Sequence, residues 1–243
     1  ALQSRWIDGS RQPSQPLAAD DIQQAVAEET AAWQLIFGQP PKVVVPPTFV
    51  WTKEVEAAWV AAGVEVIITP GRRCTHRDAA GQPAAEAGSI HNGQMVGKEA
   101  RDLVRDIYFE PERGHTAAQA LEAASRRFLL GRPALLETHR SNFIGTEAEC
   151  QRSLARLDEL LCTALQRWPG LAFLSPSALA RIYADRPGEW CASGLGARLH
   201  LLLRRLETVS RLRKLAWLTG LAVPAALVRV FTARAARRAG VAV

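Results

Sequence analysis

The sequence predicts a mixed α/β fold in which short, mostly parallel strands alternate with helices. Short apolar runs, each ended by proline, glycine or polar residues, indicate buried strands. Segments with helical spacing lie between them and begin with capping residues. Such alternation is typical of a parallel sheet. Five strands are too few for an eight-stranded barrel, so we expect an open sheet or a partial or distorted (β/α) barrel.

The expected strands cover residues 43–45, 64–69, 102–111, 134–136 and 171–174. The expected helices cover residues 20–37, 52–63, 116–130 and 146–168, and a further helix begins at residue 175. Asp20, Thr116 and Thr146 each precede a Gln or Glu by three residues, which predicts a capping box at each helix start. Residues 72–98 lack periodic apolar spacing, so we expect a long loop there.

Charge is distributed unevenly along the 243 residues. The formal net charge is +6, but residues 193–243 hold ten basic residues and one acidic residue, whereas the other 192 residues carry a balance of −3. We therefore predict a domain over residues 1–190, which is incomplete at its N-terminus if the chain is part of a longer protein, and a basic tail over residues 191–243.

The four cysteines are scattered and form no C-x-x-C pair, so neither a zinc site nor a disulfide framework is indicated. The first residues contain no apolar run typical of a secretory signal. Both observations favour a reducing compartment, and we expect a cytoplasmic protein. The chain begins with alanine rather than methionine, so we expect a segment of something longer.

Polar side chains follow the strand predicted over residues 134–136. Residues 137–142 read Glu-Thr-His-Arg-Ser-Asn, with no apolar residue among them. Open α/β sheets and barrels place their active sites at the carboxyl ends of strands. His139 is suited to proton transfer because imidazole titrates near neutral pH. The cluster marks a candidate site, or else a polar strand end where His139 merely satisfies a neighbouring carbonyl.

Four segments, in their order and spacing, resemble the polysaccharide deacetylase-like proteins of the glycoside hydrolase/deacetylase superfamily. They are VVVPPTFVW from residue 43, GVEVIITPGRR from residue 63, VRDIYFEPERGH from residue 104 and PALLETHRSNFIG from residue 133. The similarity covers roughly residues 22–182. It implies a distorted (β/α) barrel and a divalent metal, held by one Asp and two His from early strands, that polarises an acetamide carbonyl and activates water.

The resemblance implies roles mainly for the late half of the site. His139 falls at the position of a late-strand histidine and would protonate the leaving amine. The Pro-Pro pair before Trp51 falls on an earlier substrate-facing loop. The chain departs from the family because Asp20 and Asp21 stand at a helix start and no H-x-x-x-H pair occurs. We therefore assign no metal ligand, and the early metal-binding strands are missing from this chain or from the protein.

The remaining candidates for substrate binding each have a structural alternative. Glu110 ends the strand predicted over residues 102–111. Arg140 and Asn142 would hold a sugar hydroxyl or carboxylate, although Arg140 equally suits a pair with the glutamate three positions before it. Trp51 would stack on a sugar ring or fill the core beside a helix start. His91 would cover the substrate pocket of the predicted site, or else belong to a solvated loop.

Residues 194–240 predict two helices with a leucine stripe and a basic face, broken near Gly220 and Pro224. The uncharged run 215–228 has 14 residues, whereas a membrane-spanning helix needs about twenty. We expect a basic amphipathic helix at an anionic membrane surface, with Trp217 at headgroup depth, or a helical extension packed on the domain or a second subunit. No nucleic-acid-binding motif is present, so we expect no nucleic-acid partner.

Two hypotheses about function follow. The first is a carbohydrate-active hydrolase-like domain that deacetylates an N-acetylated polysaccharide or glycan precursor and is peripheral at the inner membrane face. The second is a non-catalytic glycan-binding or membrane-associated scaffold protein that has lost the metal site. The missing metal-binding motifs are the sequence feature that favours the second.

Overall fold

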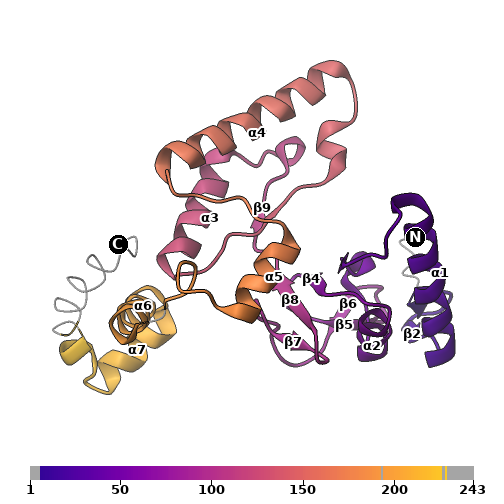
Figure 1. Ribbon diagram of the computed structural model, residues 1–243, viewed down its shortest axis with the longest axis horizontal. Helices are drawn as coiled ribbons and strands as arrows, with labels where there is room; N and C mark the ends of the chain where they lie inside the picture. The colour runs from indigo at the N-terminus through magenta and orange to yellow at the C-terminus, as the bar shows by residue number, and fades with distance from the viewer. Residues whose placement is uncertain (1–5, 193, 226–227, 229–243) are drawn as a thin grey trace. The chain divides into compact units, whose positions relative to one another are not determined.

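The computed structural model describes residues 6–192, 194–225 and 228, which form a mixed α/β fold, as predicted (Figure 1). The chain divides into two compact units. Unit 1 holds the residues up to 106 together with 171–185, and unit 2 holds residues 107–170 and those from 186 onward. The domain boundary expected at residue 190 stays a prediction. Among the described residues the strands form small sheets, and none closes into a barrel.

Unit 1 contains a four-stranded sheet in the order β3-β4-β8-β7. β3 (Val43–Val44), β4 (Val66–Thr69) and β8 (Ala100–Val104) are parallel, whereas β7 (Met95–Val96) runs antiparallel to β8. The two early strands therefore lie where the apolar runs predicted them. The prediction of one strand over residues 102–111 is wrong, because β8 ends at Val104 and a separate strand begins at Ile107.

The described part of unit 1 also contains the α-helices α1 (Ala19–Phe37), α2 (Lys53–Ala61) and α5 (Pro176–Asp185). α1 ends at Gly38, whose φ of 75° is the left-handed conformation that favours glycine. Its N-cap is Ala18, so the capping box predicted at Asp20 is wrong. The first half of α1 and one face of α2 pack into a core that includes Trp6, Ile22, Val26, Trp51, Val55, Trp59 and Ile67.

The loop predicted over residues 72–98 contains regular structure. β5 (Cys74–Arg77) and β6 (Pro83–Ala85) form an antiparallel hairpin, and β7 follows. Asp78 closes the hairpin turn, because its Oδ1 accepts hydrogen bonds from the N–H groups of Ala80 and Gln82, both at 2.9 Å. A second small hairpin pairs β1 (Ile7–Asp8) with β2 (Gln15–Pro16). The strand predicted over residues 171–174 does not form.

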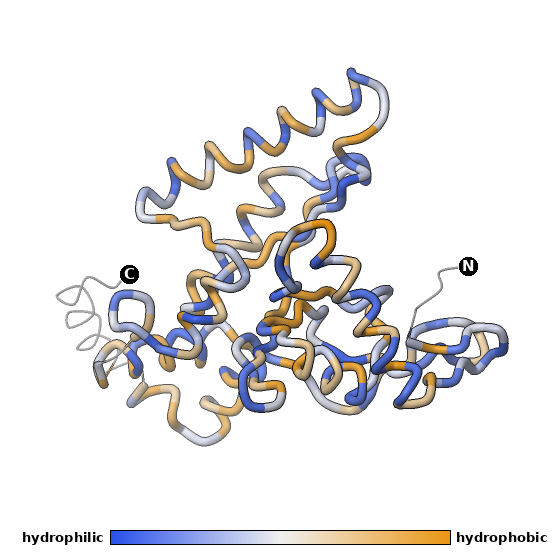
Figure 2. Tube along the Cα trace, turned by 45° about the vertical axis from the view of Figure 1, so that its right-hand side comes forward, coloured by the Kyte–Doolittle hydropathy of each residue, from blue (hydrophilic) through white to orange (hydrophobic). Residues whose placement is uncertain are grey.

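Unit 2 contains two parallel strands, β9 (Ile107–Tyr108) and β10 (Leu136–Glu137). α3 (Ala117–Leu129) connects them, and α4 (Glu147–Arg167) follows β10. Both helices begin with the predicted capping boxes, formed by Thr116 with Gln119 and by Thr146 with Glu149. Hydrophobic and hydrophilic residues alternate along α4, as expected of an amphipathic helix (Figure 2).

The last part of unit 2 is helical. α6 (Leu195–Thr208) and α7 (Ser210–Leu218) are separated at Val209, a break that the sequence did not predict. The break predicted near Gly220 is also present, because α7 ends at Leu218 and Gly220 has a φ of 73°. Val209 has extended backbone angles, with φ −85° and ψ 109°, which end α6 and begin α7. Within the described ranges no helix has both the length and the apolar character needed to cross a membrane.

Candidate active site

The carboxyl ends of β9 and β10 bring polar side chains together at one edge of unit 2. The two strands are parallel, with Tyr108 opposite Glu137. The backbone N–H of Phe109 donates to the Glu137 carbonyl at 2.8 Å, which continues this pairing by one residue. Because parallel strands end at the same edge, Glu110 after β9 and His139 after β10 become neighbours although 29 positions separate them.

Glu110 and His139 form a carboxylate–imidazole pair. Oε1 of Glu110 lies 2.7 Å from Nδ1 of His139, and the glutamate is only 1% exposed. Burial alone would raise the pKa of Glu110. Hydrogen bonds from Asn142 and His139, together with the charge of His139, outweigh burial and hold that pKa below its ordinary value. An ionised carboxyl only accepts hydrogen bonds, so we assign the shared proton to Nδ1 of the imidazole.

Asn142 holds the pair in place. It is 1% exposed, and its Nδ2 donates to Oε2 of Glu110 at 2.5 Å and to the His139 carbonyl at 2.9 Å. Its Oδ1 accepts from the backbone N–H of Glu112 at 3.2 Å. These bonds join the two short 3₁₀ helices that follow the strands, η2 (Pro111–Arg113) and η3 (Arg140–Phe143). The amide thus uses both its donor and its acceptor capacity to fix the carboxylate.

The opposite side of the imidazole is accessible. The His139 side chain is half-exposed, and its Nε2 lies 3.5 Å from Oε1 of Glu137. The exposed ring of Tyr108 stands beside it, with the two ring centroids 6.2 Å apart. A histidine that is fixed through Nδ1 and half-exposed can transfer a proton to or from a bound molecule through Nε2, with Glu137 as the neighbouring carboxylate.

His115 contacts the same edge of unit 2 through the backbone of Glu110 and the ring of Tyr108. Its Nδ1 accepts a hydrogen bond from the backbone N–H of Glu110 at 3.1 Å. Its ring meets that of Tyr108 edge-on at a centroid distance of 6.0 Å. His115 therefore positions the strand end from which Glu110 and Tyr108 project.

The structure unites only part of the predicted site. His139, Glu110 and Asn142 meet in unit 2, and Arg140 is exposed at the start of η3 beside them. Trp51 and His91 belong to unit 1. Trp51 is fully buried, with its indole N–H donating to Oε1 of Glu56 at 2.8 Å, so its ring has no exposed face for a sugar. His91 is exposed in the segment before β7.

Sequence reasoning missed Tyr108 as a neighbour of His139. The signal was the spacing, because Tyr108 and Glu110 are two positions apart at the end of an extended segment and residues so spaced share a face. Tyrosine offers an apolar ring and a hydroxyl in one side chain. Tyr108 is thus an exposed aromatic side chain at this edge, whereas Trp51, which was predicted to stack on a sugar ring, is buried.

Unit 1 contains a second group of charged side chains, most of them buried or partly buried. Arg73 pairs with the buried Glu56 and, at 3.1 Å, with Glu86. Asp102, on β8, is fully buried, and neither of its carboxylate oxygens has a hydrogen-bond partner within the described structure. Burial, and then the charge of Glu56, raise the pKa of Asp102 to about 7, although Arg73 opposes this. A carboxyl group in this setting is protonated over much of the acidic range.

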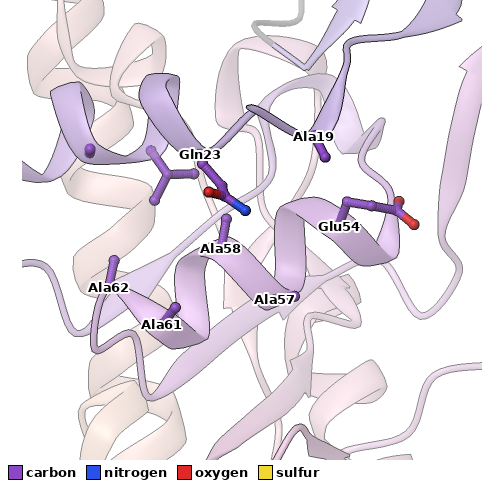
Figure 3. A pocket seen from close by; sticks show the side chains of 9 residues that line it. Ala19, Gln23, Glu54, Ala57, Ala58, Ala61 and Ala62 are labelled. Carbon is purple, nitrogen blue, oxygen red and sulfur yellow. The ribbon is translucent and has the colours of Figure 1, made fainter. Parts of the chain in front are cut away.

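A groove of about 460 Å³ lies between α1 and α2 in unit 1 (Figure 3). It is lined mostly by alanines, with Gln23 and Glu54 as its polar members. None of the predicted site residues lines it. Its lining offers no histidine or cysteine and only one carboxylate, so it is not a setting for the predicted chemistry.

The residues present do not fit the divalent metal that the family resemblance implies. Among the residues that the structure describes, no three His, Cys, Asp or Glu side chains come close enough to hold an ion. Comparison with known proteins found no matching family model, curated protein or solved structure.

Proposed function

We propose that the chain is a carbohydrate-active hydrolase-like domain that deacetylates an N-acetylated polysaccharide or glycan precursor. The observation that supports this most is the pairing of the buried Glu110 carboxylate with the half-exposed His139 imidazole, fixed by Asn142. Proton transfer by a positioned histidine is the step that amide hydrolysis needs when the amine leaves.

Each of the three residues has its own part in this proposal. His139 takes a proton at Nε2 from the water that attacks the acetamide carbonyl, and gives it to the amine nitrogen as the C–N bond breaks, so that acetic acid and the free amine are released. Glu110 keeps the other imidazole proton on Nδ1 and stabilises the imidazolium form during the transfer. Asn142 acts as a positioning residue, because it orients the carboxylate rather than the substrate. Arg140, exposed beside His139, is the proposed partner for a hydroxyl or carboxylate of the sugar.

The proposed reaction does not use the divalent metal of the polysaccharide deacetylase-like proteins, because the described residues offer it no set of ligands. We also propose that the parallel strands are part of a distorted (β/α) barrel. In support, β3 is followed by α2 and its parallel neighbour β4, and β9 by α3 and its parallel neighbour β10. Strand–helix–strand units of this kind build such barrels.

The test is acetate release from N-acetylated glucosamine oligomers by the full chain, with and without added divalent metal. Positioned acid–base groups contribute about 10²–10⁴-fold to a rate, so His139→Ala should lower kcat/KM by that factor. His76→Ala is the matched control, because it removes an imidazole from the β5–β6 hairpin of unit 1. If His139→Ala and His76→Ala hydrolyse the oligomers equally fast, the hydrolase proposal is refuted.

A second proposal is a non-catalytic glycan-binding protein. The exposed ring of Tyr108 beside His139 supports it, because aromatic rings stack on sugar rings without any chemistry. In this case Tyr108→Ala should abolish binding of the oligomers, measured by calorimetry, while no acetate is released by either protein. Rapid acetate release would favour the first proposal instead.

A further inference from the structure

The C-terminal end of α7 exposes a group of apolar side chains. Leu215, Trp217 and Leu218 are 57%, 68% and 85% exposed, and Leu221 and Val223 just beyond the helix are 58% and 62% exposed. We call these five side chains the apolar tip. Single exposed apolar residues are ordinary on protein surfaces, but five within nine consecutive positions, with tryptophan among them, indicate a surface that contacts something else.

Three basic residues lie one helical turn before the tip. Arg211, Arg213 and Lys214 are all exposed. Each stands four positions before one of the three tip residues of α7, so that every exposed apolar side chain of the helix has a cation next to it. We call these three residues the basic collar. Along α7 the cations therefore lie in the N-terminal part of the helix and the exposed apolar side chains in the C-terminal part.

α6, by contrast, is attached to the body of unit 2. Nε and Nη2 of Arg205 donate to the Leu130 carbonyl, just past the end of α3, at 3.3 and 3.2 Å. Ala197 and Leu203 are buried. Packing on the domain, one of the two expectations for the tail, therefore describes α6. It does not describe the far end of α7, whose apolar side chains remain exposed.

We propose that the apolar tip inserts into the interface of an anionic lipid bilayer while the basic collar contacts the lipid headgroups. Tryptophan is enriched at the depth of the headgroups, and lysine and arginine are attracted to anionic lipids. A symmetric contact between two copies is disfavoured, because joining two tips would bring two collars of the same charge together. The bilayer provides both an apolar layer and the opposite charge.

Flotation of the full chain with lipid vesicles tests the proposal. The wild-type protein should float with vesicles of phosphatidylcholine and phosphatidylserine, and far less with phosphatidylcholine alone. Replacing all three collar residues by glutamine should weaken partitioning about 100-fold, given the usual contribution of each basic residue near an anionic surface. The double variant Trp217→Ser and Leu218→Ser should lose binding to both kinds of vesicle.

Two control proteins separate the tip and collar from general surface effects. The first replaces Arg126, Arg152 and Arg156, exposed on α3 and α4, by glutamine and so removes the same charge elsewhere in unit 2. The second is Leu35→Ser, which removes a side chain that is 88% exposed on α1. Both should float like the wild type, and circular dichroism should show the same helix content in every variant.

Three outcomes would overturn the proposal. In the first, the wild type does not float with anionic vesicles. In the second, the variant without the basic collar floats as well as the variant that lacks Arg126, Arg152 and Arg156. In the third, the wild type forms dimers by gel filtration, the tip variant is monomeric, and neither binds vesicles, so that a second copy covers the tip.

Discussion

Replacing Asp102 by asparagine should change how the stability of unit 1 depends on pH. The carboxyl group is fully buried on β8, and its pKa is raised from 3.8 to about 7 by burial and by the charge of Glu56. The folded protein therefore binds a proton more tightly at this group than the unfolded chain does. The stabilisation from that proton is complete below the unfolded pKa and is lost as the pH rises through about 7.

The size of the effect follows from the two pKa values. At about 1.36 kcal/mol for each pH unit, the displacement from 3.8 to about 7 corresponds to about 4 kcal/mol over the whole titration. Between pH 5 and pH 8 the linkage relation gives a loss of about 2.5 kcal/mol. Entire domains are stable by roughly 5–15 kcal/mol, so the loss is readily measured.

Urea unfolding at pH 5 and pH 8, followed by tryptophan fluorescence, measures the effect. Trp6, Trp51 and Trp59 lie in the core of unit 1 and report on its unfolding. The stability of Asp102→Asn relative to the wild type should rise by about 2.5 kcal/mol between the two pH values, because asparagine does not titrate. Asp21→Asn, at an exposed position of α1, should show no such rise. A difference between Asp102→Asn and the wild type that stays constant with pH would refute the reasoning.

Two further predictions concern the candidate site. Asn142→Ala should lower the free energy of unfolding by about 2–4 kcal/mol, because it removes the hydrogen-bond partner of Oε2 of the buried Glu110 and of the Glu112 N–H. Denaturant titration checks this, with the exposed Ser141→Ala expected to stay within about 0.5 kcal/mol of the wild type. The depressed pKa of Glu110 stabilises the fold above the ordinary value of 4.5, and this contribution is lost as the pH falls through the folded pKa. Glu110→Gln should therefore lose less stability than the wild type on acidification below that value, and an equal loss in both proteins would contradict the assigned hydrogen bonds.

The parts of the fold that depend on local chemistry could be predicted from the sequence. The capping boxes at Thr116 and Thr146 formed as expected, because a hydroxyl and a side chain three residues later suffice to make them. The hairpin from Cys74 to Ala85 was missed. Its strands show no apolar alternation, since the hairpin is only half-buried and its turn is set by one aspartate.

Burial could not be predicted where it depends on a distant partner. α1 has apolar residues at helical spacing throughout, but Trp33, Ile36 and Phe37 are exposed because only the first half of the helix meets the core. Trp51 is buried in the core of unit 1, where Glu56, in the next helix, accepts a hydrogen bond from its indole N–H.

The residues of the candidate site could be predicted from the sequence, but the contacts between them could not. Glu110, His139 and Asn142 each stood out at a strand end, where polar side chains of this kind gather. Their contacts depend on the parallel pairing of Tyr108 with Glu137, which no pattern within either segment reveals.

A double-mutant cycle on acetate release tests the central claim that His139 and Glu110 act as one proton-transfer unit. The kcat/KM values of the wild type, His139→Ala, Glu110→Gln and the double variant are measured on the same oligomer. If Glu110 acts only through the imidazole it holds at 2.7 Å, the double variant should be no slower than His139→Ala alone. Losses that multiply, so that the double variant is slower by the product of the two single effects, would contradict the claim.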